Sequence, residues 1–517
     1  MKMKLQRMNS QRAVARTCQE ARMAWHQKDY PQYFKIMERV SRENPGDAGL
    51  LLDIAAAYGM RYEYTTAESW FEKALRVAPS RGQVLVLAAT QCRGFERYEM
   101  ARAYFERAIK EPEVSPSTFV KLAEVYERFR MLSEAGELVD RALAMAPGDP
   151  LATLVRARLD RLSGRREEAE RRLRPLLALS DRDSWSTRIR GWYEMGMVLD
   201  GQGRYDEAMT AFLEAKKMIL PNAAQHIANQ KMVHSRLKIA EEKLNAELMG
   251  RWKAQAPASE PCRLALLCGH PRSGTTLLEQ VLDSHPGFVS AEETRIFSQE
   301  AYTHILRDMP PKTLLVDALE SVSTGVLRQA RLNYANCMTR FLGHPPDARM
   351  LIDKNPSLTG LVPAFARVFP ESKLLVALRD PRDVCLSCFM QPLPLGQVSS
   401  IFLSLETTAL EYASTMGLWR AAAACLGGSY MEVRYEEVVA DLEGVSRRAL
   451  EYLGADWDER VLRFNEYAGS KLVRSPTYAA VAKPISKGAV GRWRNYQKYL
   501  EPHLDTLAPL LKAFGYE

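Results

Sequence analysis

The sequence contains no run of eighteen apolar residues, and it therefore predicts no membrane-spanning helix. Its first twenty residues carry basic side chains but neither an apolar core nor a small-residue cleavage site, so they do not resemble a secretory signal. Cysteine is sparse, with 8 scattered residues, and one C-x-x-C pair, Cys385 and Cys388, has no second Cys or His pair to join it in a metal site. Two reduced thiols on a helix are favoured over redox or metal chemistry. Together, these absences predict a protein of the reducing cytoplasm that is not inserted in a membrane.

Composition and length fit a globular protein of more than one domain. The 517 residues exceed one ordinary core, and 46% are apolar while 26% are charged. Residues 1–250 hold 41 Lys+Arg and 34 Asp+Glu, a balance of +7, whereas residues 251–517 hold 30 and 29, a balance of +1. The excess in the first half favours acidic partners, although solvated helix faces explain most such excesses. We expect no nucleic-acid partner.

A period of 34 residues runs through the first half. Successive copies of a helical pattern begin at Tyr33, Ala67, Ala101, Ala135 and Ala169, and a further copy follows after 39 residues at Ala208. Small residues at fixed helical spacing let two helices of one copy approach closely, and a proline that ends several copies stops the second helix. Over roughly residues 15–220 the pattern resembles the tetratricopeptide repeat.

Stacked repeats of this kind bury a shared core and form an α-helical solenoid with a concave groove. Capture of a peptide or protein by the groove, and a scaffold that only dimerises or stabilises the second half, are both open interpretations. Residues 224–250 predict a polar capping helix. The expected domains are a repeat array with its cap over 1–250, a linker over 251–262 and a second domain over 263–517.

One segment in the second half resembles a phosphate-binding loop but lacks the usual lysine. The segment GHPRSGTT, Gly269–Thr276, has the G-x-x-x-x-G spacing, but Thr275 stands where a nucleoside-triphosphate loop carries lysine. A predicted strand, Leu264–Cys268, precedes the loop, and a predicted helix, Thr275–His285, follows it. Backbone N–H groups and the helix dipole would therefore face an anion. The expected contacts come from Arg272, Ser273, Gly274, Thr275 and Thr276.

Further strand–helix alternation predicts a parallel sheet in an α/β domain. Strands are expected in RMLIDKNP, in KLLVAL and in SYMEVRY, and SLTGLVPAFARVFP is expected to be helical. Ligands of such sheets bind at the carboxyl ends of the strands. Polar residues stand at the predicted ends, namely Arg272, Lys354, Arg379 and Tyr435.

These motifs together resemble a known enzyme family. PRSGTTLLEQVLDSHP resembles the 5′-phosphosulfate loop, and RDPRDVCLS the 3′-phosphate motif, of sulfotransferases that use 3′-phosphoadenylyl sulfate (PAPS). AEETR, DKNP and RYEEVV narrow the resemblance to the tyrosylprotein sulfotransferases, over about residues 263–495. A repeat array ahead of this domain looks like the bacterial repeat-bearing sulfotransferases. The implied architecture is a tetratricopeptide solenoid followed by an α/β, P-loop-like sulfotransferase domain that takes PAPS as co-substrate and no metal.

The resemblance also implies residue roles. Glu293, rather than its neighbour Glu292, matches the catalytic general base, and Lys354 and Ser475 match residues that stabilise the transition state. Contacts to PAPS are implied for Arg272 at the 5′-phosphosulfate, Arg379 and Ser387 at the 3′-phosphate, Tyr435 near the adenosine, and Lys483 and Arg492 in a late basic loop.

Other charged residues near these motifs have less direct roles. Arg295 is expected to hold an acidic acceptor peptide. Asp380 and Asp383 would repel a phosphate, so they are expected to orient the arginines. Gln299 and Gln391 stand where the animal enzymes carry arginines, which leaves the preference for acidic flanks open.

The leading hypothesis is therefore a sulfotransferase acting on tyrosine in a protein or peptide, and a homodimer is an open alternative to a monomer. Three other functions stay open. In the first, the enzyme is a sulfotransferase whose acceptor is a carbohydrate or small molecule. In the second, the chain is a kinase or nucleoside triphosphatase, although the absent loop lysine argues against this. In the third, it is a repeat scaffold with an inactive transferase domain.

Overall fold

The computed structural model describes residues 16–180, 184–256, 262–393, 395–396, 399–470 and 481–517. The chain divides into two compact units, Met1–Val155 and Arg156–Glu517. This division follows packing, and the last repeat helices fall in the second unit. The domain limits 1–250 and 263–517 follow sequence similarity instead and stay a prediction. The expected linker lies partly outside the described residues.

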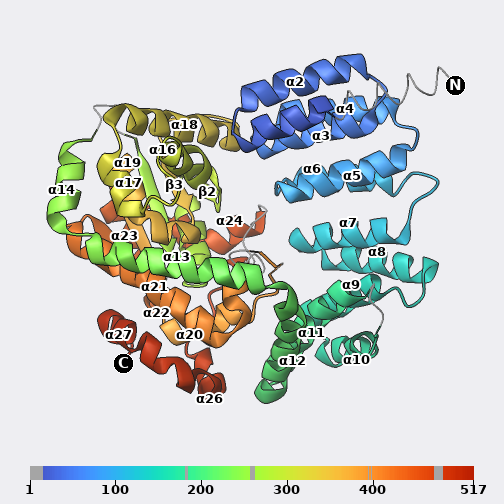
Figure 1. Cartoon of the computed structure of the whole chain (residues 1–517). Coiled ribbons are helices and arrows are strands. Elements are labelled where there is room, and N and C mark those ends of the chain that lie inside the picture. Colours follow the sequence, from blue (N-terminus) through green and yellow to red (C-terminus); the bar gives the residue numbers. More distant parts are fainter. Residues whose placement is uncertain (1–15, 181–183, 257–261, 394, 397–398, 471–480) are drawn as a thin grey trace. The chain divides into compact units, whose positions relative to one another are not determined.

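The first unit is a series of helical hairpins, drawn in blue to cyan in Figure 1. Helices α3 and α4, α5 and α6, and α7 and α8 pack as pairs. Small residues of the 34-residue pattern, such as Ala55, Ala74 and Ala89, are fully buried where the helices meet. The predicted helical repeats are confirmed. The bounds are α2 Tyr30–Glu43, α3 Ala48–Met60, α4 Tyr64–Val77, α5 Arg81–Gly94, α6 Tyr98–Ala108, α7 Pro116–Arg128 and α8 Leu132–Met145.

The second unit begins with the remaining repeat helices. Helix α9, Pro150–Leu162, runs across the division, and α10 (Arg166–Leu177), α11 (Trp185–Gly201) and α12 (Tyr205–Ile219) follow it. Helices α11 and α12 pack against each other as a hairpin. The following segment leads on to the α/β part.

Two helices stand where one capping helix was expected. They are α13, Ala224–Lys243, and α14, Ala246–Ala254. The side chain of Asn245 accepts a hydrogen bond from the N–H of Leu248 at 2.9 Å, which starts a new helix at this point. Helix α13 packs along α21 (Leu405–Cys425), as Figure 1 shows. The segment therefore covers the α/β part as well as following the repeats.

A five-stranded sheet with the order β2-β3-β1-β4-β5 forms the centre of this unit, and every neighbouring pair is parallel. The predicted parallel sheet is confirmed, and the apolar run at 264–268 is the fully buried central strand. The edge strand β2 was not predicted. The bounds are β1 Leu264–Gly269, β2 Phe288–Glu292, β3 Met350–Lys354, β4 Lys373–Leu378 and β5 Tyr430–Arg434.

Helices connect the strands and pack on the sheet. The expected helix after β3 is a 3₁₀ segment, η3, followed by the short helix α19, because Pro363 stands in the first turn of α19, where a missing N–H costs least. The principal elements are α15 Thr275–Asp283, α18 Thr324–Leu342, η3 Pro356–Leu361, α19 Val362–Val368, α20 Pro381–Phe389, η4 Ser399–Leu403, α22 Tyr435–Ala440, α23 Leu442–Leu453, α24 Phe464–Ser470, η7 Arg492–Tyr496 and α27 Leu504–Phe514.

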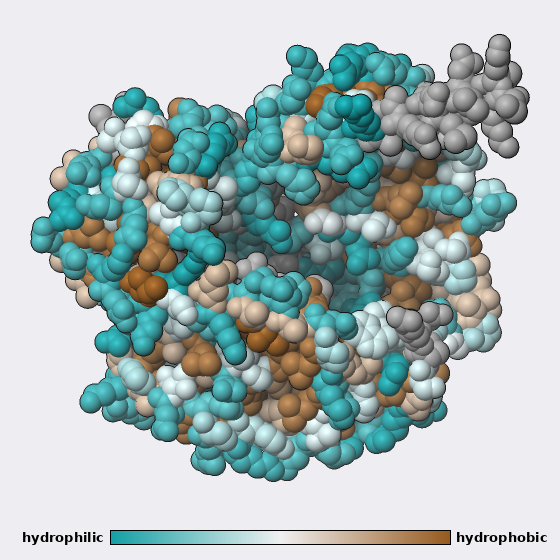
Figure 2. Space-filling view, viewed as in Figure 1, coloured by the Kyte–Doolittle hydropathy of each residue, from teal (hydrophilic) through white to brown (hydrophobic). Residues whose placement is uncertain are grey.

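The surface is mainly polar on the face that Figure 2 presents, with hydrophobic residues in patches between hydrophilic ones. Within the described ranges, no helix combines the length and the apolar character needed to cross a bilayer.

Candidate active site

The loop after β1 requires an unusual backbone. Arg272 and Gly274 have φ angles of 74° and 97°, in the left-handed region that favours glycine. A Cβ atom on Gly274 would lie 2.7 Å from Cδ2 of Tyr435, so no other residue fits there without a shift. Helix α15 begins at Thr275, directly after this glycine. The loop thus delivers the N-terminus of α15 to the carboxyl edge of the sheet, as the sequence predicted.

A cavity of about 660 Å³ lies at this edge, which is the size of a small-molecule site. Residues that follow β1, β2, β3, β4 and β5 all contribute to its wall. Ten of the fourteen site residues expected from the sequence line it, namely Arg272, Gly274, Thr275, Thr276, Glu293, Arg379, Ser387, Tyr435, Lys483 and Arg492.

Three arginines converge on the cavity. The Nε of Arg272 donates to the Oγ of Ser387 at 3.0 Å, and the Nη1 of Arg379 donates to the carbonyl of Arg272 at 3.2 Å. Burial, and then the positive charges of Arg379 and Arg492, lower the pKa of Arg272 below its ordinary value. The Nε of Arg379 is buried and has no hydrogen-bond partner within the described part of the chain. A cluster of mutually repelling guanidinium groups with an unused donor fits a bound anion.

Glu293 follows β2 and reaches the cavity from the opposite edge of the sheet. Its φ of 50° is rare for a residue with a side chain, and its N–H donates to the carbonyl of Lys354 at 2.8 Å. Its side chain is 39% exposed and lines the cavity, whereas the neighbouring Glu292 is buried and does not. Strained backbone of this kind is concentrated at functional sites. The geometry therefore favours Glu293 over Glu292 as the residue that meets a ligand.

Lys354 lies fully buried behind Glu293. Its Nζ is 2.7 Å from Oε1 of Glu293, 3.4 Å from Oε1 of Glu292 and 3.9 Å from Oε2 of Glu279. Burial alone would lower the pKa of Lys354, but these carboxylates, Glu293 first among them, raise it above its ordinary value. Lys354 is therefore an ammonium that fixes the position of Glu293, and it meets the cavity only through that glutamate.

Two other expected residues that the structure describes do not line the cavity. Ser273 is buried within the loop, and Arg295 is exposed away from the cavity wall. Ser475 lies outside the described residues. Within the part that the structure describes, no group of three or more His, Cys, Asp or Glu side chains is arranged to hold a metal ion. Cys385 and Cys388 are both thiols in α20.

Asp383 fixes the late basic loop to α20. Its two carboxylate oxygens accept the N–H groups of Gly491 at 2.7 Å and Trp493 at 2.8 Å, and Oδ2 also lies 3.6 Å from Nη2 of Arg379. The Nη2 of Arg379 donates to the carbonyl of Ala489 in the same loop. Asp380 instead pairs with Arg382 at 2.8 Å. The two aspartates do hold arginines, and Asp383 also holds backbone that forms the cavity wall.

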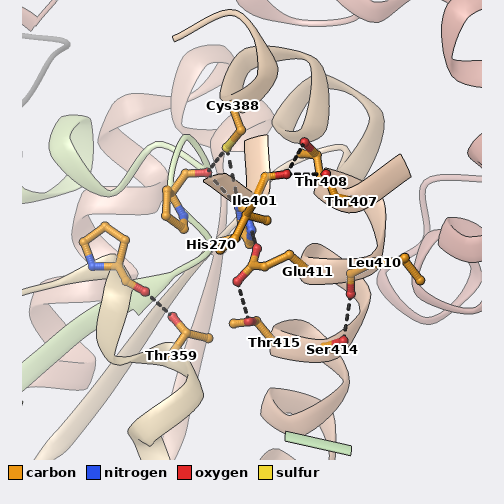
Figure 3. Close-up of polar contacts among 12 residues, drawn as sticks. His270, Thr359, Cys388, Ile401, Thr407, Thr408, Leu410, Glu411, Ser414 and Thr415 are labelled. Atoms are coloured by element: carbon orange, nitrogen blue, oxygen red, sulfur yellow. Dashed lines mark hydrogen bonds and ion pairs between the residues drawn. The ribbon is translucent and has the colours of Figure 1, made fainter. Parts of the chain in front are cut away.

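An ion pair that no sequence motif indicated links the loop after β1 to α21 (Figure 3). The Nε2 of His270 lies 2.5 Å from Oε2 of Glu411 in α21, and Oε1 of Glu411 accepts a hydrogen bond from Thr415 at 2.8 Å. Burial alone would lower the pKa of His270, but the charge of Glu411 raises it well above its ordinary value. The protonated ring can then donate from Nδ1 to the carbonyl of Pro271, 2.9 Å away. Helix α21 thereby fixes, through His270, the carbonyl of Pro271 near the start of the loop.

Glu411→Gln should lower the free energy of unfolding by about 1–3 kcal/mol at pH 6, because it leaves a buried group without its charged partner. The pKa of His270 in the folded protein is raised above its unfolded value of about 6.5, so its stabilisation is complete below that pH. This stabilisation is lost as the pH rises through the folded pKa. The difference between wild type and variant should therefore shrink from pH 6 to pH 9 in urea unfolding.

Glu406→Gln, an exposed glutamate in the first turn of the same helix, is the matched control and should change stability by no more than about 0.5 kcal/mol. A Glu411→Gln deficit that is constant across this pH range would contradict a charged His270–Glu411 pair.

Comparison with known proteins agrees with the fold. Residues 265–459 match the family model described as the sulfotransferase family, and residues 93–150 and 189–219 match tetratricopeptide-repeat models. The chain carries a sulfotransferase-family domain behind a tetratricopeptide-repeat region.

Relatives of the chain include named enzymes at low identity. It is 24% identical to an uncharacterized protein of Aquifex aeolicus (strain VF5), over 62% of this chain and 41% of that protein. It is 26% identical to protein-tyrosine sulfotransferase A of Caenorhabditis elegans, over 48% of this chain and 66% of that protein. It is 29% identical to protein-tyrosine sulfotransferase 1 of Danio rerio, over 49% of this chain and 72% of that protein. The chain thus spans less than two thirds of the length of the first two relatives.

Proposed function

We propose that the chain transfers the sulfuryl group of PAPS to the hydroxyl of a tyrosine in a protein or peptide. The observation that carries this proposal is the cavity at the carboxyl edge of the sheet, where three arginines and a helix N-terminus face the space that Glu293 also lines. A cationic pocket with one partly exposed carboxylate suits an anionic donor and an acceptor that must lose a proton.

The donor has two anionic ends, and the wall offers two sets of groups for them. Arg272 and the backbone N–H groups at the start of α15 would hold the 5′-phosphosulfate. Arg379 and Ser387, which sit on the β4 end and on α20, would hold the 3′-phosphate. The Nε of Arg379 has no hydrogen-bond partner among the described residues, and burial together with the charges of Arg379 and Arg492 lowers the pKa of Arg272; both observations support anion binding. Tyr435 and Lys483 would contact the rest of the nucleotide.

The chemistry needs one proton transfer and one displacement. Glu293 accepts the proton of the acceptor hydroxyl as the acceptor oxygen bonds to sulfur, and the bond between sulfur and the bridging oxygen of the donor breaks. The leaving 3′-phosphoadenosine 5′-phosphate takes the electron pair, and its negative charge faces Arg272 and the loop N–H groups. Lys354 holds Glu293 in place through their 2.7 Å contact. A phenol, with a pKa of about 10, is within reach of a carboxylate base in a site that excludes water.

Two observations favour an aromatic acceptor. Two of the relatives compared above are named protein-tyrosine sulfotransferases. The cavity wall is also rich in apolar side chains, which suit an aromatic ring better than a sugar. These residues are Leu277, Leu393, Phe402, Phe464 and Ile485. Capture of the acceptor in the repeat groove, recognition of acidic flanks by Arg295, dimerisation and a cytoplasmic location stay predictions.

Transfer of labelled sulfate from PAPS tests the function. A set of tyrosine peptides should be labelled, and matched peptides with phenylalanine in place of tyrosine should not. Labelling of glycans alone would defeat the tyrosine proposal while keeping the sulfotransferase. Binding of 3′-phosphoadenosine 5′-phosphate without transfer to any acceptor would favour the inactive scaffold. Magnesium-dependent binding of ATP in preference to this nucleotide would favour a kinase or triphosphatase.

A further inference from the structure

The last repeat hairpin, α11 and α12, contacts the wall of the cavity. Asp200, near the end of α11, has Oδ2 at 2.6 Å from Nη2 of Arg492, and its Oδ1 accepts a hydrogen bond from the hydroxyl of Tyr496 at 2.7 Å. Arg492 lines the cavity, and Tyr496 is fully buried. One carboxylate of the repeat region therefore holds both ends of η7, the segment that closes the late basic loop.

A second contact links the same hairpin to another part of the wall. The buried Nζ of Lys216, in α12, donates to the carbonyl of Phe402 at 2.5 Å, and it lies 4.4 Å from the ring centroid of Phe389. Phe402 lines the cavity, and Phe389 belongs to α20, the helix that carries Ser387. The hairpin thus reaches two separate elements of the cavity, and all of these residues lie in the same compact unit.

Electrostatics explain why Arg492 needs an anchor. Burial is the main cause of the lowered pKa of Arg272, and the charges of Arg379 and Arg492 lower it further, so both of these groups repel the guanidinium of Arg272. A long arginine side chain without a partner would relieve this repulsion by turning toward water, and it would lose rotamer freedom on returning to a ligand. The side chain of Asp200 is only 15% exposed, and its charge offsets the repulsion and keeps Arg492 at the cavity. A group held in place before binding loses less entropy when the ligand arrives.

We propose that Asp200 is a positioning residue of the donor site, so that the terminal repeat completes the pocket for the nucleotide. This inference rests on the proposed function, namely that the cavity binds the 3′-phosphorylated donor. It assigns the repeat region a part in donor binding, in addition to the capture of an acceptor that the sequence predicts.

Asp200→Asn in the full chain should weaken the affinity for 3′-phosphoadenosine 5′-phosphate about tenfold, as expected for the loss of one charged contact. In transfer assays KM for PAPS should rise by about the same factor while kcat changes less than about twofold. Tyr496→Phe keeps the buried ring and removes only the hydroxyl, so it should fold like the wild type and weaken the affinity by about threefold. Calorimetric titration of each purified variant measures the affinities.

Asp206→Asn is the matched control. Asp206 lies on the same hairpin and contacts Lys498 at 2.8 Å and Tyr499 at 3.0 Å, but neither partner lines the cavity. Its substitution should leave nucleotide affinity unchanged within about twofold. Equal losses in Asp200→Asn and Asp206→Asn would mean that any loosening of the hairpin matters, and would overturn the role of Asp200.

Two further outcomes separate this inference from the function beneath it. If the wild type fails to bind the bisphosphate nucleotide at all, the proposed function fails first. If the wild type binds and Asp200→Asn and Tyr496→Phe bind equally well, only the positioning role is wrong. Tighter binding by Asp200→Asn would show that Asp200 competes with the nucleotide for Arg492, and would also overturn the proposal.

Discussion

Glu293→Gln should slow sulfuryl transfer by about 10²–10⁴-fold and leave donor affinity nearly unchanged. Glutamine has the shape of glutamate but cannot accept the proton of the acceptor hydroxyl. Donor affinity is expected to survive because the proposed contacts to the nucleotide come from the arginine cluster, which lies on other elements of the sheet edge. Lys354 should stay charged, since Glu292 and Glu279 remain 3.4 and 3.9 Å from its Nζ. Single-turnover transfer from labelled PAPS, with a separate titration of the nucleotide, measures both quantities.

Glu292→Gln is the comparison that the chain itself provides. Both glutamates contact Lys354, but only Glu293 lines the cavity, so Glu292→Gln should reduce transfer by less than about tenfold. A larger loss in Glu292→Gln than in Glu293→Gln would mean that Glu292, and not Glu293, accepts the proton. Loss of nucleotide affinity in Glu293→Gln would place that residue in donor binding instead.

The central sheet could be predicted from the sequence because its strands are short apolar runs between strong interruptions. Strand β1 is buried along its whole length, and β4 is buried in five of its six residues, so both read as continuous apolar segments. The edge strand β2, with the sequence FVSAE, has only two bulky apolar residues and was missed. Its place is fixed by pairing with β3, which no local pattern reveals. Glu293 was nevertheless predicted as a site residue, through its resemblance to a family motif and not through the strand that precedes it.

The meeting of the loop after β1 and the motif after β4 at one cavity could also be predicted, since each of these parts is local in sequence. The loop 269–276 and the motif from Arg379 to Ser387 each lie on one strand–turn–helix unit, and parallel strands bring such units to one edge. The supporting contacts could not. His270 and Glu411 are 141 residues apart, and Asp200 and Arg492 are 292 apart and belong to different kinds of structure. A histidine in the loop or an aspartate ending a repeat helix has many ordinary explanations until the packing is known.

The contacts between the last repeats and the α/β part were likewise not predictable from the sequence. The 34-residue period correctly predicts helical repeats, because it reflects contacts within each copy and with its neighbours. The period carries no information about contacts outside the array. Helix α12 continues the pattern at Ala208, yet Lys216 in the same helix is buried against the peptide carbonyl of Phe402. The last repeats therefore pack with the α/β part in one compact unit.

Arg379→Ala should weaken the affinity for 3′-phosphoadenosine 5′-phosphate by about 2–5 kcal/mol, which is roughly 30- to 5,000-fold. Arg379 is 7% exposed, lies at the end of β4 and keeps an Nε donor without a partner in the described residues. In the variant, the 3′-phosphate would be buried beside Ser387 without the charged contact that Arg379 supplies. Titration calorimetry on the wild type and the variant measures the loss.

The same titration with adenosine 5′-phosphate separates a phosphate contact from a general loosening of the site. This nucleotide lacks the 3′-phosphate, so the wild type should bind it much more weakly, and Arg379→Ala should change its affinity by less than about threefold. Arg379 also donates to the carbonyls of Arg272 and Ala489, and a purely structural role would weaken both nucleotides equally. Arg420→Ala, at an exposed position of α21, should bind both nucleotides like the wild type. Equal wild-type affinity for the two nucleotides would remove the 3′-phosphate site from the cavity, and with it the case for PAPS over other adenosine nucleotides.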